Sequence, residues 1–324
     1  MSSLNPPLPS SKVAPKRALA MTRQKFISHL KGIIPPVVTP FNRRGELDEG
    51  SFRENLQRYT GIGLGGILVC GSTGEAPYLT ERERLRLVDV ARRIIRPPEI
   101  LMVGTGLEST AGTLRLSREA IARGADTVLV ITPCYYKARM DADTVVAHYR
   151  AVARGISRPL LVYSIPQFTG LRLETQTIAR LSRIRNVVGL KESSGDLSYV
   201  KTILRRVRPG FRVLVGSVLI LYDALRAGAA GAVLSQANFV PEICVSVYEA
   251  FLRKHGREAQ ALQHRLVPLA QKIAAPYGVA GIKVALDLCG YAGGLARPPL
   301  LPLSTQAKKQ VSAALREARA GLEY

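Results

Sequence analysis

Residues 186–198 read NVVGLKESSGDLS, and this stretch contains the transition from strand to helix that decides the fold. The segment Val187–Lys191 is short, apolar and rich in β-branched residues, as a buried strand is. A polar turn follows, and a helix is predicted to begin near Asp196. Lys191 therefore stands at the carboxyl end of a strand, where a charged side chain needs an explanation.

The same unit, an apolar run, a loop and an amphipathic helix, recurs along the chain from residue 32. The predicted strands are Ile33–Thr39, Gly66–Cys70, Ile100–Gly104, Thr127–Thr132, Leu160–Tyr163, Val187–Lys191, Val213–Gly216 and Gly231–Leu234. The intervening helices are predicted to begin near Asp48, Thr80, Ser109, Ala142, Glu174, Asp196, Val218 and Pro241. Strands separated by helices pair in parallel. Eight such units predict an α/β fold, a closed (β/α)8 TIM barrel with additional C-terminal helices, rather than an open sheet.

This pattern divides the chain into three segments. Residues 1–30 lack Asp and Glu and contain several prolines, which predicts a disordered basic N-terminal tail, with an organelle transit peptide as the alternative. Residues 31–255 form the predicted barrel. Residues 256–324 are predicted to form a C-terminal helical extension.

The charge of the chain is strongly basic. Lys and Arg number 46 against 24 Asp and Glu, which gives a formal net charge of +22 at pH 7. Such a surface suits nucleic acid or an acidic substrate. The arginines are spread over many amphipathic helices, without a recognisable nucleic-acid-binding module, so we interpret the charge as a solvated surface and expect no nucleic-acid partner. A basic nucleic-acid-binding protein on a barrel scaffold stays the alternative from a different class.

Several other classes of function are disfavoured. No apolar run reaches the ~20 residues that span a membrane, so we expect no membrane partner. The four cysteines form no CxxC pair and the four histidines form no HxH or HExxH pair, so we expect no metal site. The wide spacing of the cysteines also argues against a disulfide framework, and we expect a cytoplasmic protein. The GxGxxG match at 61–66 ends a helix and precedes a strand, unlike a dinucleotide fingerprint, and no cofactor is expected.

In such barrels the active site lies at the carboxyl ends of the strands. Burial there disfavours the cationic form of Lys191, and a neutral amine can attack a ketone to form a Schiff base. Tyr163 ends the preceding strand and offers a phenol that can move protons. The GSTGE turn (71–75) offers backbone N–H groups and the hydroxyls of Ser72 and Thr73 to a carboxylate. Each feature has a plain alternative: a solvated lysine, a packing tyrosine, an ordinary turn.

The order of motifs over roughly residues 30 to 320 resembles the dihydrodipicolinate synthase / N-acetylneuraminate lyase family. The motifs are PPVVTPF (35–41), GSTGE (71–75), TPCYY (132–136), YSIPQFTG (163–170), GLKESSGD (189–196) and GAVLSQAN (231–238). The resemblance implies a class I, metal-independent carbon–carbon lyase. It implies that Lys191 forms the Schiff base with pyruvate or another 2-oxo acid and that Tyr163 is the general acid/base. Ser72 and Thr73 would bind the carboxylate of the 2-oxo acid.

The resemblance also implies an assembly. Tyr135 is similar to the family tyrosine that enters a neighbouring subunit's site and completes a hydroxyl relay with Thr73 and Tyr163. Val233 matches a position whose backbone lines the pyruvate pocket. Members of the family are usually homotetramers built as dimers of dimers, and we expect the same here.

One residue departs from the family pattern. Dihydrodipicolinate synthases carry an arginine for the carboxylate of the aldehyde substrate where this chain has Phe168, and a phenyl ring cannot pair with a carboxylate. The stretches TPCYYKARM (132–140), LQHRL (262–266) and GIKVALDLCGYAGG with RPPL (281–300) resemble the 4-hydroxy-2-oxoglutarate aldolase branch, in which Ser193 would contact the carboxylate on the aldehyde side.

These observations rank the candidate reactions. The first choice is cleavage of 4-hydroxy-2-oxoglutarate to pyruvate and glyoxylate. The alternative is 4-hydroxy-tetrahydrodipicolinate (dihydrodipicolinate) synthase, and a sugar-acid aldolase or dehydratase comes third.

Overall fold

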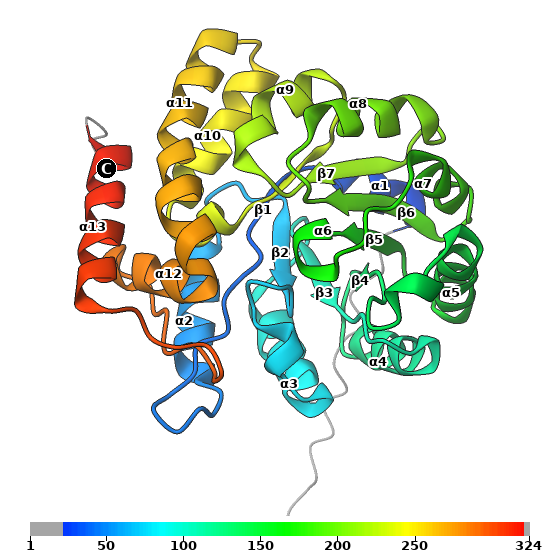
Figure 1. Cartoon of the computed structure of the whole chain (residues 1–324), viewed down its shortest axis with the longest axis horizontal. Helices are drawn as coiled ribbons and strands as arrows, with labels where there is room; N and C mark the ends of the chain where they lie inside the picture. Colours follow the sequence, from blue (N-terminus) through cyan, green and yellow to red (C-terminus); the bar gives the residue numbers. More distant parts are fainter. Residues whose placement is uncertain (1–21, 321–324) are drawn as a thin grey trace, which may run out of the picture.

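Eight short parallel strands form the centre of the computed structural model, which describes residues 22–320 (Figure 1). Their order in the sheet is β1-β8-β7-β6-β5-β4-β3-β2, so strands that follow each other along the chain are neighbours in the sheet, except at the point of closure between β1 and β2. The strands are β1 (Gly32–Ile34), β2 (Gly66–Val69), β3 (Ile100–Gly104), β4 (Thr127–Ile131), β5 (Leu160–Ser164), β6 (Val187–Glu192), β7 (Arg212–Val215) and β8 (Gly231–Val233).

The barrel closes between β1 and β2 through an irregular contact. A single parallel bridge joins Pro36 to Leu68, and the backbone N–H of Leu68 donates to Pro35 O at 3.0 Å. Proline has no N–H, so Pro35 and Pro36 cannot continue a regular ladder. Val37 N donates to Leu68 O at 3.0 Å and completes this contact. The Asn238 side chain, which follows β8, fixes the same segment from the other side: its Nδ2 donates to Pro36 O at 3.0 Å and its Oδ1 accepts from Val38 N at 3.1 Å. The predicted (β/α)8 barrel is confirmed.

A helix follows each strand and covers the outside of the barrel (Figure 1). The helices are α2 (Glu49–Tyr59), α3 (Glu81–Ile94), α4 (Thr110–Ala122), α5 (Ala142–Gly155), α7 (Thr175–Ser182), α8 (Leu197–Arg206), α9 (Leu221–Arg226) and α10 (Pro241–Leu252). Their starts follow from local chemistry, since Asp48, Thr80, Ser109 and Asp196 each accept a backbone N–H of the first turn. At α3, Glu83 completes a capping box with Thr80.

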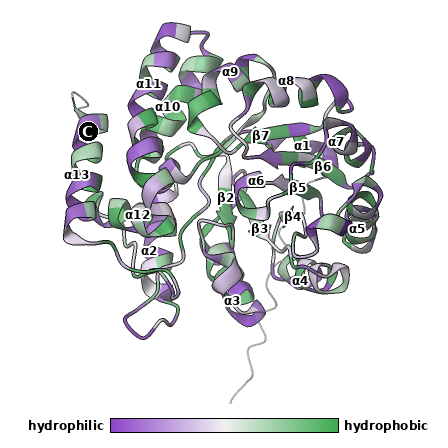
Figure 2. Ribbon diagram, in the orientation of Figure 1, coloured by the Kyte–Doolittle hydropathy of each residue, from purple (hydrophilic) through white to green (hydrophobic). Residues whose placement is uncertain are grey.

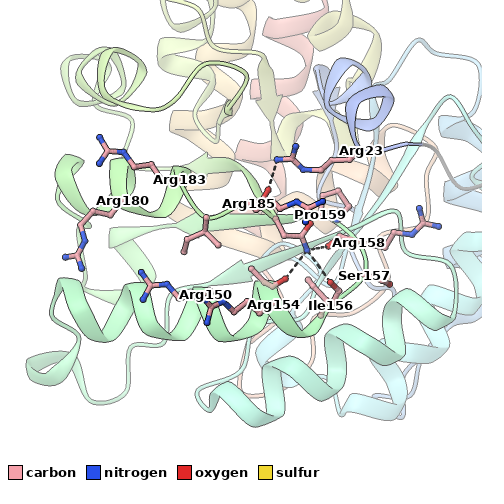
Figure 3. A pocket seen from close by; sticks show the side chains of 13 residues that line it. Arg23, Arg150, Arg154, Ile156, Ser157, Arg158, Pro159, Arg180, Arg183 and Arg185 are labelled. Atoms are coloured by element: carbon pink, nitrogen blue, oxygen red, sulfur yellow. Dashed lines mark hydrogen bonds between the residues drawn. The ribbon is translucent and has the colours of Figure 1, made fainter.

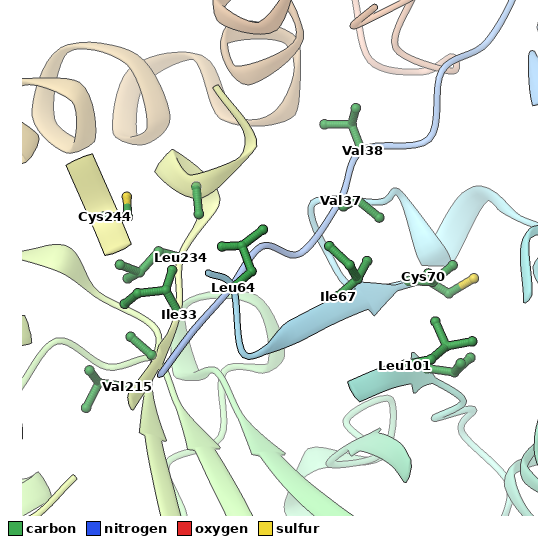
Figure 4. Close-up of a cluster of buried hydrophobic side chains, with 14 of the residues drawn as sticks. Ile33, Val37, Val38, Leu64, Ile67, Cys70, Leu101, Val215, Leu234 and Cys244 are labelled. Carbon is green, nitrogen blue, oxygen red and sulfur yellow. The ribbon is translucent and has the colours of Figure 1, made fainter. Parts of the chain in front are cut away.

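The buried apolar side chains form two layers. The larger layer lies between the strands and the helices, and Figure 4 shows a part of it, with Leu234 beside Ile33 and Cys244, and Ile67 near Val37. The smaller layer fills the inside of the barrel. Along the strands, side chains alternate between these layers, because successive Cβ atoms point to opposite faces. Hydropathy follows the same division: the strands and parts of α10 are green in Figure 2, whereas the tip of α3 and stretches of α11 and α13 are purple.

The predicted disordered tail over residues 1–30 is wrong for its last part, while residues 1–21 lie outside the described residues. Helix α1 (Arg23–His29) begins at Thr22, whose side chain accepts the N–H of Lys25, and Phe26 and Leu30 are buried in the layer inside the barrel. The reason is that the amino ends of the strands leave an apolar opening, which these two side chains fill. Composition alone did not reveal this helix, because seven residues are too few for a periodic pattern.

The predicted C-terminal helices are present and lie together on one side of the barrel (Figure 1). They are α11 (Gly256–Leu269), the π-helical turn η5 (Ala270–Ala274), α12 (Ala275–Leu288) and α13 (Thr305–Arg319). Their apolar faces join the same layer as the barrel helices, with Leu266, Ile273 and Leu286 fully buried. The division into a barrel of residues 31–255 and an extension of residues 256–324 stays a prediction. None of the helices in residues 22–320 combines the length and the apolar character needed to cross a bilayer.

Replacing Phe26 by alanine tests whether α1 seals the barrel. Phe26 is 2% exposed, so Phe26→Ala should lower the free energy of unfolding by about 3 kcal/mol through lost burial and a cavity. Phe168→Ala is the matched control, because that ring is 70% exposed and its loss should change stability by less than about 0.5 kcal/mol. Urea unfolding measures both, and equal effects would show that α1 does not close the barrel.

Candidate active site

Lys191 points into the barrel because strand β6 contains one extra residue. Leu160 pairs with Val187 but Leu161 pairs with Gly189, so Val188 is inserted between two rungs of the ladder. The Val188 side chain packs inside the barrel. If side chains alternated strictly from Val188 onward, the Lys191 side chain, three residues later, would point outward, toward the helices. The extra residue reverses that alternation, as β-bulges beside active sites often do. Lys191 is therefore 4% exposed in the barrel mouth, directly opposite Tyr163 on β5.

Lys191, Tyr163 and Ser72 form a short row across this mouth. The ammonium nitrogen of Lys191 lies 4.1 Å from the centroid of the Tyr163 ring, and the Tyr163 hydroxyl lies 3.3 Å from Ser72 Oγ. Thr132 holds β5 in place, since its backbone N–H donates to Tyr163 O at 3.2 Å. An amine, a phenol and an alcohol are thus within reach of one small ligand. The three residues were predicted to lie at one mouth of the barrel, and their roles in a reaction stay a prediction.

The loop that carries Ser72 and Thr73 has a strained backbone at both ends. Cys70 and Glu75 flank the GSTG turn with φ of 57° and 55°, in the left-handed region that non-glycine residues seldom occupy. Such conformations cost on the order of 1–3 kcal/mol each and persist only where the surroundings hold them. Thr39 holds the turn from one side, because its hydroxyl donates to Gly74 O at 2.7 Å. The Thr73 side chain makes no hydrogen bond within residues 22–320.

A buried ion pair holds the other end of this loop. Lys283 Nζ on α12 lies 2.5 Å from Glu75 Oε1, and both side chains are almost completely buried. Lys283 also donates to Thr39 O at 2.7 Å and to Leu295 O at 2.6 Å. Within residues 22–320 no hydrogen bond reaches Glu75 Oε1, so the ammonium group is the partner of that oxygen. Burial lowers the pKa of Lys283, and the Glu75 carboxylate opposes this effect.

Arg297 adds a second link between the C-terminal segment and the same loop. Its backbone N–H donates to Glu75 Oε2 at 2.8 Å, and its guanidinium group contacts both carboxylate oxygens of Glu83, at 2.6 and 2.9 Å. This contact lowers the pKa of Glu83 to about 2. The ring of Phe41 lies beneath both cations, 4.1 Å from the Arg297 guanidinium carbon and 4.7 Å from Lys283 Nζ. The loop that would bind a carboxylate is thus fastened from outside the barrel.

Val233 and Ser193 also stand at the barrel mouth. Val233 ends β8 and packs in the same inner layer as Tyr163. Ser193 follows β6, with its N–H donating to Ser164 O at 3.0 Å. A Cβ at position 216 would lie 2.0 Å from Ser193 Oγ, so only glycine leaves room for that hydroxyl beside β7. The predicted contact of Ser193 with a substrate carboxylate stays a prediction.

Tyr135 is not brought to the other predicted residues within one chain. Its ring is 76% exposed and packs edge-on against Tyr136, with ring centroids 5.0 Å apart. The loop is held by Glu108, whose Oε2 accepts from the N–H groups of Cys134 and Tyr135. Within the described residues no hydrogen bond joins Tyr135 to Thr73 or Tyr163. Phe168, on the short helix α6 (Pro166–Thr169), is exposed as well.

Three contributions to the site were missed from the sequence. Lys283 could have been suspected, because GIKVALDLC (281–289) places one lysine between apolar neighbours in a predicted helix. Asn238 lies in a quoted motif but gives no sign that it completes the closure of the barrel. The extra residue Val188 leaves no trace in a strand of uninterrupted apolar residues. Among residues 22–320 no three His, Cys, Asp or Glu side chains cluster closely enough to hold a metal ion.

Comparison with known proteins gives consistent matches over nearly the whole chain. The model described as Dihydrodipicolinate synthetase family matches residues 29–318. A 4-hydroxy-tetrahydrodipicolinate synthase from Methanothrix thermoacetophila is 35% identical over 277 residues, which cover 85% of this chain and 92% of the relative. One from Phenylobacterium zucineum is 34% identical over 290 residues, covering 89% and 97%.

Solved structures agree with this similarity. YagE, a prophage protein of E. coli K12 solved in complex with pyruvate, superposes with a TM-score of 0.85 at 28% identity, over 90% of this chain and 99% of that one. The 4-hydroxy-tetrahydrodipicolinate synthase of Methylacidiphilum fumariolicum SolV has a TM-score of 0.84 at 28% identity, over 90% and 96%.

Removing the buried ammonium group tests how much the loop depends on it. Lys283→Met leaves the Glu75 carboxylate buried without a partner and should lower the free energy of unfolding by about 3–5 kcal/mol. Lys272→Met is the matched control, because Lys272 Nζ also lies 2.5 Å from a carboxylate, Glu317, but both side chains are half-exposed. Its loss should cost less than about 1 kcal/mol. Adding Glu75→Gln to Lys283→Met should recover part of the loss, and no recovery would contradict the pairing.

Proposed function

The chain belongs to the dihydrodipicolinate synthetase family, and from that premise we propose that Lys191 forms a Schiff base with pyruvate. The family places the protein among the metal-independent class I carbon–carbon lyases. The observation that carries the assignment to Lys191 is its position 4.1 Å from the Tyr163 ring, whose hydroxyl lies 3.3 Å from Ser72 Oγ. The pyruvate complex of YagE supports pyruvate as the ligand of the corresponding site.

Each residue has a defined task in the proposed reaction. The neutral amine of Lys191 attacks the keto carbon, water leaves, and the iminium group withdraws electrons from the neighbouring carbon, at which a C–C bond forms or breaks. Tyr163 carries protons between the reacting atoms and Ser72. The N–H groups of the loop that carries Ser72 and Thr73 bind the carboxylate, since preorganised donors stabilise negative charge without reorganisation. The ion pair of Glu75 with Lys283 keeps these donors in place.

For the second substrate, the names of the relatives favour the dihydrodipicolinate synthase reaction, which was the alternative in the sequence analysis, over cleavage of 4-hydroxy-2-oxoglutarate, which was its first choice. The relatives described above are 4-hydroxy-tetrahydrodipicolinate synthases, so our first candidate is condensation of pyruvate with aspartate semialdehyde. Phe168 favours the second candidate, cleavage of 4-hydroxy-2-oxoglutarate to pyruvate and glyoxylate. Arg172, which is near in sequence, is already paired with Asp196 at 2.7 Å and stacks on Tyr199. The smaller glyoxylate carboxylate could be bound by hydroxyls such as that of Ser193.

We also propose that the active site is completed by a neighbouring subunit in a homotetramer. The exposed pair Tyr135 and Tyr136 supports this, because exposed aromatic side chains are typical anchors of protein interfaces. A cytoplasmic location stays a prediction.

Trapping with borohydride tests the role of Lys191. Incubation with pyruvate and borohydride should add the mass of one reduced pyruvyl group, and peptide mapping should place it on Lys191. Lys191→Ala should lose the adduct and the activity, while the control Lys201→Ala, at an exposed site on α8, should keep both. An adduct on Lys283 or elsewhere would contradict the assignment.

Restoring the arginine tests the interpretation of position 168. Phe168→Arg should raise kcat/KM for condensation with aspartate semialdehyde by about tenfold or more, since a charge-assisted contact contributes about 1.5–3 kcal/mol. Phe168→Leu is the control and should not raise it. On the unmodified enzyme, the same two assays, coupled pyruvate release and the coupled reductase, decide between the candidates. Faster condensation supports the first candidate, and faster cleavage supports the second.

Subunit mixing tests the role of Tyr135. A mixture of Tyr135→Phe and Lys191→Ala subunits, allowed to exchange, should recover up to about a quarter of the wild-type activity if Tyr135 serves a neighbour, because hybrid dimers then contain one intact site. Each variant incubated alone is the control. No recovery after proven exchange would place Tyr135 in its own subunit's site or outside the reaction.

A further inference from the structure

A pocket of about 780 Å³ at the foot of the barrel is lined mainly by arginine side chains (Figure 3). It lies at the amino ends of β5 and β6, whereas Tyr163 and Lys191 stand at their carboxyl ends. A strand of five residues separates the two ends by about 15 Å, at roughly 3.3 Å per residue. The pocket is therefore separate from the proposed active site.

The arginines of this pocket come from three parts of the chain. They converge from α1, from α5 with the turn before β5, and from α7 with the turn before β6: Arg23, Arg150, Arg154, Arg158, Arg183 and Arg185. The spread of arginines along the sequence predicts a dispersed charge. Folding places all six around one hollow, with Arg150 and Arg183 at one side of it and Arg23 beside Arg185 at the other (Figure 3).

The positive charge of the pocket is not neutralised by the protein. No Asp or Glu lines it, and within residues 22–320 none of the six arginines forms an ion pair. A seventh lining arginine, Arg180, is paired with Asp143 at 2.5 Å. Like charges held close together repel each other and destabilise the compact state. A bound anion would remove this repulsion.

The pocket has a floor held by hydrogen bonds. The Asn186 side chain donates to Ala153 O, Ile156 O and Arg158 O at 3.1, 3.4 and 2.8 Å, which joins the end of α5 to the start of β6. Arg23 Nη2 donates to Arg185 O at 2.6 Å and so fastens α1 to the same turn. The guanidinium groups that surround this floor are thus presented by a fixed backbone rather than by a loose loop.

The chemistry of the lining indicates which anion fits. Arginine matches phosphate with two parallel N–H donors, whereas a stack of bases needs aromatic side chains. The lining contains no Phe, Tyr or Trp. The pocket is a half-open hollow, and most of its arginines are exposed around it. A hollow of this size suits a small anion, whereas a long polymer would follow a stripe of charge.

We propose that this pocket binds a small anion with several phosphate groups, either a free polyphosphate or the phosphate chain of a nucleoside triphosphate. The arginines contact the phosphates, and Ile156, Pro159 and Ile184 supply the apolar part of the lining between them.

Calorimetric titration with inorganic tripolyphosphate tests the proposal, at about 0.15 M salt, where exposed charges farther apart than about 8 Å are screened. The unmodified protein should bind tripolyphosphate, and the double variant Arg154→Gln/Arg183→Gln should bind it at least tenfold more weakly. The matched control, Arg93→Gln/Arg257→Gln, removes the same charge from exposed sites on α3 and α11 and should bind like the unmodified protein. Formation of the pyruvate adduct should be unchanged in both, which shows that they fold.

Titration with ATP distinguishes the two sources of phosphate. Equal or weaker binding of ATP supports recognition of the phosphate chain alone, and tighter binding supports a nucleoside triphosphate. The proposal is overturned if tripolyphosphate does not bind, if the control pair weakens binding as much as the pocket pair, or if a short single-stranded oligonucleotide binds tighter than either small ligand.

Discussion

The inserted residue Val188 in β6 decides which way Lys191 points, and the candidate active site depends on this direction. Without it, the two-residue period of the strand would turn Lys191 toward the surrounding helices and away from Tyr163. With it, the amine faces the phenol across one rung of the ladder. The parallel barrel then adds the remaining groups, because every strand ends at the same rim.

The rim is supported by the C-terminal helices as well as by the barrel. Lys283 and Arg297 reach back from the extension to Glu75, next to the strained turn that carries Ser72 and Thr73. A buried ion pair is rarely more stabilising than an apolar contact of the same shape, but it tolerates only one arrangement of its partners. We infer that its value here is positional: it holds Glu75 in a left-handed conformation that would otherwise relax. The extension is thus part of the active site's support.

The two ends of the barrel differ in chemistry. The upper rim offers a few hydroxyls and backbone donors around a single buried lysine, which suits a small 2-oxo acid. The lower end concentrates arginines that the protein leaves without carboxylate partners in its described part. Phe168 is exposed where the family pattern has an arginine, so this position adds no positive charge. The charge of +22 therefore does not translate into a basic active site.

The sequence by itself determined the eight strand–helix units and the starts of most helices, and it placed Lys191 and Tyr163 at strand ends as candidate site residues. These follow from local rules, since apolar period, capping residues and turn chemistry act over a few neighbouring positions. The tertiary structure decided what depends on distant partners: the outward or inward direction of Lys191, the pairing of Glu75 with Lys283, and the burial of Phe26 in α1. It also left Tyr135 exposed, without a hydrogen bond to Thr73 in the described part of the chain. Contacts between residues far apart in the sequence leave no periodic signal, because each is fixed only when the barrel closes.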